Sequence, residues 1–184
     1  IMIEIGSTEF LIKVPSLSER DFELYSSRLF DKWESSVESS LLLPDYSISL
    51  EVEEGSISGK AKIAAAVGAI YMGIANYGGF ISGLQTIQSQ ISYVNNLLVE
   101  SAKQPFACSK KDLIVRNRGG ALTKLKFLFH KVQKGELTAD KATLYALELF
   151  GEEAENIPGF IAQLKNDFES VPKYPEQFSL RHSE

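Results

Sequence analysis

The most constraining feature of this sequence is an uncharged run of 37 residues, from Ile63 to Val99. The run contains no Asp, Glu, Lys or Arg, although charged residues make up 23% of the whole chain. A stretch of this length without charge has to be covered by the protein's own core, by a partner or by a lipid bilayer. The run therefore limits which architectures are open to the chain.

The first part of the run, residues 63–82, is rich in glycine and alanine. Its small residues recur at spacings of four and five, which on a helix places them along one side and lets another backbone approach closely. From residue 83 onward, apolar residues at spacings of three and four predict an amphipathic helix. We expect a long uncharged helix, or a broken one, over 63–99, packed through Gly68, Gly73, Gly79 and Gly83.

Three interpretations of residues 63–82 are open. Twenty residues are enough to cross roughly 30 Å of hydrocarbon. Tyr71, Asn76, Tyr77 and the glycines, however, lower the hydrophobicity of the segment. We therefore favour a helix buried against the sheet of the same domain, with a membrane-inserting or spanning segment and a protein–protein packing surface as alternatives.

A β-hairpin is the clearest local signal. Tyr46 to Val52 and Ile57 to Ile63 alternate between apolar or small and polar residues, with Gly55-Ser56 between them, a pair that suits a two-residue turn. Counting outward from this turn predicts a register with four cross-strand pairs. These pairs are Val52 with Gly59, Glu51 with Lys60, Leu50 with Ala61, and Ile48 with Ile63.

A strand and a helix are expected before the hairpin. The β-rich residues 8–14 end at Pro15 and can continue residues 2–5 through Gly6-Ser7. Ser16-Leu17-Ser18-Glu19 matches a capping box and predicts the start of a helix. The apolar face of this helix consists of Phe22, Tyr25, Leu29, Trp33 and Val37.

Three short helices are expected after a loop at Arg116–Gly120. They cover about 121–134, the segment between Thr138 and Gly151, and the segment from Pro158 to about Phe168. The tail from Val171 reads as irregular. The inner face of the second of these helices is expected to hold Ala142, Leu144, Tyr145, Leu147 and Leu149.

The sequence thus predicts the α+β class. We expect an α+β domain over 1–102, with the hairpin at 46–63 and the uncharged helical run at 63–99. A basic linker over 103–120 follows, and then a short helical subdomain with an irregular tail over 121–184.

Charge is divided sharply along the chain. Residues 1–102 hold 13 acids and 6 bases, residues 103–134 hold nine bases and one acid, and residues 135–184 hold ten acids and four bases. The basic segment 103–134 is dense enough to contact phosphates, an anionic surface or an acidic protein face. As the candidate basic patch we take Lys110, Lys111, Arg116, Arg118, Lys124 and Lys126.

No catalytic, metal or cofactor motif is found. Cys108 is the single cysteine, and neither His130 nor His182 has a second metal ligand or a nucleophile at a suitable spacing. Gly55 to Ala61 resembles a phosphate-binding loop only superficially, because the glycine spacing is too short and no Ser or Thr follows Lys60. We predict no catalytic residues, no metal and no cofactor.

The lone cysteine and the absence of an N-terminal apolar signal favour the cytoplasm, with membrane association as an alternative. We expect a non-enzymatic protein–protein interaction module, a subunit of a larger assembly, with a protein partner or self-association. Two alternatives are a membrane-inserting effector using residues 63–82 and a nucleic-acid-binding accessory protein using residues 103–134. Whether the chain binds a small molecule is left open by the sequence.

Overall fold

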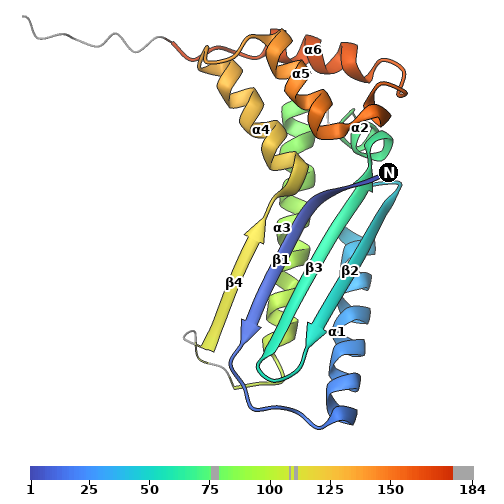
Figure 1. Ribbon diagram of the computed structural model, residues 1–184, viewed down its shortest axis with the longest axis vertical. Helices are drawn as coiled ribbons and strands as arrows, with labels where there is room; N and C mark the ends of the chain where they lie inside the picture. Colours follow the sequence, from blue (N-terminus) through green and yellow to red (C-terminus); the bar gives the residue numbers. More distant parts are fainter. Residues whose placement is uncertain (76–78, 108, 110–111, 176–184) are drawn as a thin grey trace, which may run out of the picture.

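A four-stranded antiparallel sheet organises the fold (Figure 1). Its strands are β1 (Met2–Ile12), β2 (Tyr46–Glu53), β3 (Ile57–Ala66) and β4 (Leu113–Arg118), in the spatial order β2-β3-β1-β4. The computed structural model describes residues 1–75, 79–107, 109 and 112–175. The predicted α+β class is confirmed.

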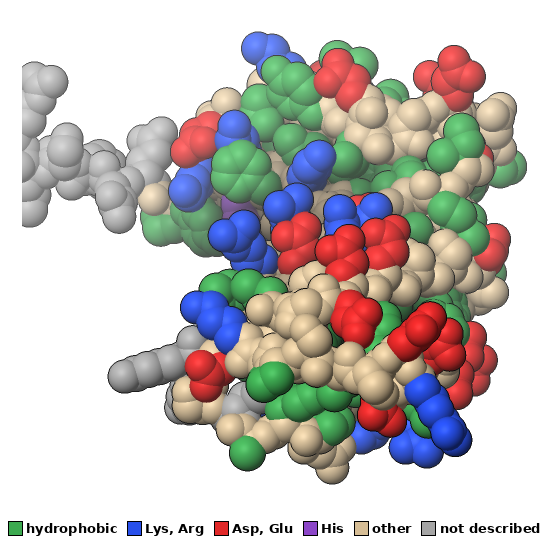
Figure 2. Space-filling model, turned by 60° about the horizontal axis from the view of Figure 1, so that its bottom comes forward, with side chains coloured by type: hydrophobic (Ala, Val, Ile, Leu, Met, Phe, Trp, Pro, Cys, Tyr) green, Lys and Arg blue, Asp and Glu red, His purple; other side chains and the backbone are tan. Residues whose placement is uncertain are grey.

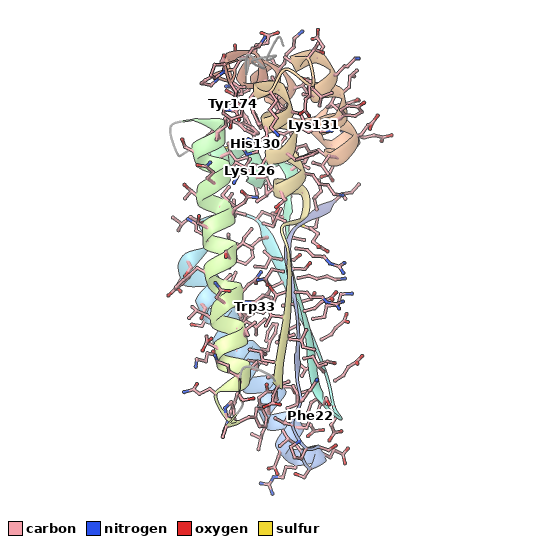
Figure 3. The ribbon with its side chains drawn as sticks, turned by 90° about the vertical axis from the view of Figure 1, so that its left-hand side faces the viewer. Phe22, Trp33, Lys126, His130, Lys131 and Tyr174 are labelled. Atoms are coloured by element: carbon pink, nitrogen blue, oxygen red, sulfur yellow. The ribbon has the colours of Figure 1, made fainter. Side chains whose placement is uncertain are left out.

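Helices α1 (Glu19–Ser40) and α3 (Phe80–Lys103) cover one face of this sheet, and no helix of the described residues lies over the other face (Figure 3). The order is β1-α1-β2-β3-α2-α3-β4, where α2 spans Val67–Ala75; apart from this additional helix, the order and strand arrangement are those of the split βαβ, or ferredoxin-like, topology. That topology supports many unrelated functions, so function has to be argued from the surfaces.

The remaining helices gather at one end of the sheet. They are α2 (Val67–Ala75), α4 (Gly120–Gln133), α5 (Ala139–Phe150), the short 3-10 helix η2 (Glu152–Ala154) and α6 (Phe160–Ser170). Helix α3 runs from this group along the length of the sheet (Figure 1). It therefore links the sheet layer to the C-terminal helices.

The hairpin forms with the predicted register, and all four expected pairs are confirmed. Gly55 in the turn has a φ of 119°, a conformation that only glycine adopts readily. Strand β3 continues to Ala66, so the first residues of the uncharged run lie in a strand and not in a helix. The rest of the described run is divided between α2 and α3.

Two N-terminal boundaries differ from the prediction. Strand β1 joins residues 2–5 to the following residues through Gly6-Ser7, as expected, with an irregularity in its register with β3 between Glu4 and Gly6, but it ends at Ile12 and not at residue 14. Helix α1 is capped by Ser18, whose hydroxyl accepts a hydrogen bond from the Asp21 amide. Ser16 donates instead to the Gly55 carbonyl, so the cap lies two residues later than the first serine of the predicted box.

The prediction of a loop at Arg116–Gly120 is wrong, because Leu113 to Arg118 form β4. This strand pairs with β1 from Ser7↔Arg118 to Ile12↔Leu113. The basic segment therefore supplies an edge of the sheet. The long sequence separation of the two strands hides this pairing from local patterns.

The core is one hydrophobic cluster that extends from the sheet layer into the C-terminal helices. Trp33 of α1 is 1% exposed and lies between the helix layer and the sheet (Figure 3). At the other end, the Phe129 ring stacks between Phe80 and Phe168, with centroid distances of 5.2 and 4.2 Å. This aromatic stack joins α3, α4 and α6.

Candidate functional site

The four glycines expected to pack helices fall into two pairs. A Cβ on Gly83 would meet the backbone of Ile74, including its Cα at 2.7 Å, so α2 and α3 approach closely there. A Cβ on Gly73 would meet the Leu43 and Ile87 side chains. Gly68 and Gly79 have their nearest neighbour at 3.9 Å. At Gly73 and Gly83 the small side of the run thus packs inside this chain.

The uncharged residues 63–82 do not form one continuous helix, because the segment begins in β3 and is then divided between α2 and α3. Of the helices in the described residues, none is both long enough and apolar enough to span a membrane.

The predicted basic patch is distributed over two elements. Arg116 and Arg118 lie on β4, and Lys124 and Lys126 lie on α4. Lys110 and Lys111 lie outside the described residues. Arg116, Lys126 and Lys124 each line a different groove, so these described members are not gathered at one groove.

On the sheet, the basic side chains belong to an ordered charge row. Glu51 of β2 pairs with Lys60 of β3, Lys60 with Glu9 of β1, and Glu9 with Arg116 of β4. Arg118 in the next row has its Nη2 3.8 Å from Glu9 Oε1. Figure 2 shows such neighbouring blue and red side chains across the middle of the molecule. Opposite charges in directly paired positions stabilise a solvated sheet face.

On α4, the two lysines point to different grooves. Lys126 lines a groove of about 370 Å³ with Gln85, Gln88, Ser89 and Ser92 of α3. Figure 3 shows Lys126 and His130 on the side of α4 that faces the viewer, beside α3. His130 Nδ1 lies 3.1 Å from Gln133 Oε1.

Lys124 belongs to an apolar groove between α4 and α5. This groove has a volume of about 650 Å³ and is lined by Thr123, Lys124, Phe127, Leu128, Tyr145, Glu148 and Leu149. Two of its aromatic side chains are strongly exposed, Phe127 at 58% and Tyr145 at 49%. Leu144, next to Tyr145 on α5, is 61% exposed. We call Phe127, Leu144, Tyr145 and this groove the α4/α5 face.

Positive charge borders the apolar part of the α4/α5 face. The Lys131 Nζ lies 4.8 Å from the centroid of the Phe127 ring, in a cation–π contact. Lys124 and Glu148 stand at the groove itself. The face thus presents an exposed phenyl ring with two lysines near it and one carboxylate opposite.

The sequence interpretation missed this face because it placed Leu144 and Tyr145 inside. The buried residues of α5 are Ala142, Thr143, Ala146 and Phe150. The buried Thr143 hydroxyl donates a hydrogen bond to the Ala139 carbonyl oxygen, at an Oγ1–O distance of 2.8 Å. The spacing of Ala142, Ala146 and Phe150 was a usable signal, but the larger apolar side chains between them outweighed it.

Two ionisable groups of the C-terminal helices have shifted pKa values. A hydrogen bond from Lys165 to Asp140, with an Nζ–Oδ1 distance of 2.7 Å, raises the pKa of the lysine. Burial raises the pKa of Asp167, and the Gln163 amide, which donates to its Oδ1, opposes this rise. The Lys165–Asp140 ion pair connects α6 to α5, and the Gln163–Asp167 hydrogen bond lies within α6.

In the part of the chain that the structure describes, no three His, Cys, Asp or Glu side chains are placed to hold a metal ion. No protein-family model matches the sequence, and comparisons with curated proteins and with solved structures give no match either.

Proposed function

We propose that this chain is a non-enzymatic protein-interaction module that docks onto a partner protein through the α4/α5 face. The observation that carries the proposal is the exposure of Phe127 and Tyr145 at one groove, with Leu144 exposed next to Tyr145 on α5. Burying a large apolar side chain contributes about 1.5–3 kcal/mol. These three side chains are 49–61% exposed, so covering them would contribute about half of that amount each.

The shape of the face supports a helical partner segment. A groove between two helices accepts the apolar side of an amphipathic helix, with anchor residues at spacings of three and four. Phe127 and Tyr145 would contact such anchors from the two walls. Lys124 and Lys131 favour acidic residues at the edge of the partner's apolar side.

The experiment is affinity capture from the native host with the wild-type chain and matched variants, in the presence of nuclease and detergent. We expect Phe127→Asp and Leu144→Asp each to abolish recovery of the partner. Tyr93→Asp is the matched control, because Tyr93 is 55% exposed on α3 and does not line the groove. A partner recovered equally with all three variants would overturn the proposal.

Nucleic-acid binding is the second candidate, supported by the polar groove that Lys126 shares with the Gln and Ser side chains of α3. Amide, hydroxyl and ammonium groups are all suited to phosphate and sugar contacts. This role predicts retention of DNA or RNA at low salt that is lost with Lys126→Glu and unaffected by Leu144→Asp. The same set of variants therefore separates the two candidates.

A further inference from the structure

Strand β2 forms one edge of the sheet, and no strand of the described residues lies beyond it. Exposed edges are usually protected by Pro, Lys, bulges or a short strand. Strand β2 has eight residues, contains neither Pro nor Lys, and keeps a regular register with β3. The strand does carry two charged side chains, Glu51 and Glu53, so its edge is open to pairing with a strand that complements these carboxylates.

The side of β2 that faces the helices is only half covered. Tyr46, Ile48, Leu50 and Val52 are all intermediate in burial, whereas the matching positions of β3 are buried. Beside them, Ser26, Ser27, Phe30 and Asp31 of α1 complete a groove of about 410 Å³ with Leu50 and Val52. An added strand would cover these apolar side chains and fill the groove.

The charges around this edge are mainly acidic. On the open face of the sheet, Glu51 and Glu53 point outward from β2. On the helix side, Asp31 lines the groove. Burial raises the pKa of Tyr46, and the negative charges of Glu38 and Glu34 raise it further, so these two carboxylates lie close to the strand.

The bases near this edge lie on β3 and α1, and Lys62 of β3 is directly opposite Ser49 of β2. Lys60 sits between Glu51 and Glu9 in the sheet row. Arg28 and Lys32 of α1 line a different groove with Phe106, and Lys32 Nζ bonds the Gln104 side chain at 3.2 Å. The charged side chains that an added strand would meet first are therefore acidic, Glu51 and Glu53 on the open face and Asp31 on the helix side, with Lys60 and Lys62 one strand further away.

We propose that the free edge of β2 accepts an extended basic segment of a partner protein as a fifth strand. The segment's apolar side chains would pack on Phe30, Leu50 and Val52, and its Lys or Arg residues would face Glu51 and Glu53. Adding a strand to a sheet edge gives main-chain hydrogen bonds, and alternate side chains then give specificity. A second copy of this chain fits less well, because it would bring two acidic sides of α1 together.

The test uses a synthetic peptide of about eight residues that alternates Val and Lys, a length that matches a typical strand. We expect it to bind the full chain and to slow hydrogen exchange of the outward-facing amides of β2. The double variant Glu51→Gln, Glu53→Gln should weaken binding about tenfold, since both attractive charge contacts are lost. A peptide with Glu in place of Lys should not bind.

The control variant is Glu136→Lys, a charge reversal at an exposed residue that follows α4. It should leave binding of the Val/Lys peptide unchanged, and so should Leu144→Asp on the α4/α5 face. Unchanged exchange in β2, equal binding by the double variant and by Glu136→Lys, or dimers of the free chain that protect β2 would each overturn the proposal. The Leu144→Asp arm keeps this result separate from the role proposed for the α4/α5 face.

Discussion

The uncharged run 63–99 and the strand–helix segment 113–134 that follows it differ in what their surfaces meet. In the first, Gly83 and Ile87 face other parts of the chain. In the second, the charged side chains of β4 face a charged row of the same sheet, while Phe127 of α4 faces outward. The run is used largely for internal packing, and the following segment forms both a sheet edge and an exposed apolar face.

This difference shows that a conspicuous composition does not identify a binding surface. Whether a side chain is available to a partner depends on which residues of the same chain already contact it. Arg116 has Glu9 opposite it, so its charge is compensated within the sheet. Phe127 contacts Lys131 but remains more than half exposed, so its apolar surface is uncovered.

The strongest test of the comparison is Gly83→Ala. The new methyl group would collide with the backbone of Ile74, which cannot rotate away as a side chain can. We expect a loss of about 3 kcal/mol in the free energy of unfolding, measured by urea denaturation. Gly68→Ala is the matched control, because only Ile157 comes near at 3.9 Å and alanine favours the helix. Equal losses for both variants would contradict the assigned packing.

Part of this architecture was accessible from the sequence because its signals are local. The hairpin register follows from strict alternation around Gly55-Ser56, and the buried face of α3 follows from spacings of three and four. The caps at Thr138 and Gly151 were likewise predicted and are confirmed. In each case the residues that determine the structure are close together in the sequence.

The remaining part depends on partners that are distant in sequence. Residues 113–118 alternate between the two faces of the sheet, but Arg116-Asn117-Arg118-Gly119-Gly120 reads as a loop until β1 is placed beside it. The outward position of Leu144 and Tyr145 depends on α4 and α6 packing against the small side of α5. The α4/α5 face was missed for this reason.

A second test reverses the charge of Arg116. Arg116→Glu would place two carboxylates in directly paired positions of β1 and β4, at Glu9 and residue 116. We expect thermal unfolding to report a loss of about 1 kcal/mol, and Arg116→Lys to cost little. The loss should shrink at about 1 M salt, where exposed charges are screened. A penalty that is insensitive to salt would show that Arg116 acts through packing and not through charge.

A third test compares the compensated charge of Arg116 with a half-buried charge at Asp167. Burial raises the pKa of Asp167, so the folded state binds the proton more tightly than the unfolded state. Stability from this group is present below the unfolded pKa and is lost as the pH rises through the folded value. Asp167→Asn should therefore raise stability at pH near 7 by about 0.5 kcal/mol, a small effect because the group is partly solvated.

The check on this prediction is its pH dependence. Near pH 3 the wild-type carboxyl is mostly protonated in both states, so the gain from Asp167→Asn should disappear there. A gain of the same size at both pH values would indicate a packing effect of the amide.

An equally small effect on stability is expected for Phe127→Ala, and this variant sharpens the comparison most directly. The side chain is 58% exposed and its one cation–π contact with Lys131 is open to solvent, so its removal should cost about 0.5 kcal/mol. Phe129→Ala, two residues away, removes the ring stacked between Phe80 and Phe168 and should cost about 3–5 kcal/mol. Similar losses for the two variants in urea denaturation would mean that Phe127 is part of the core, and the α4/α5 face would then have no uncovered centre for a partner to occupy.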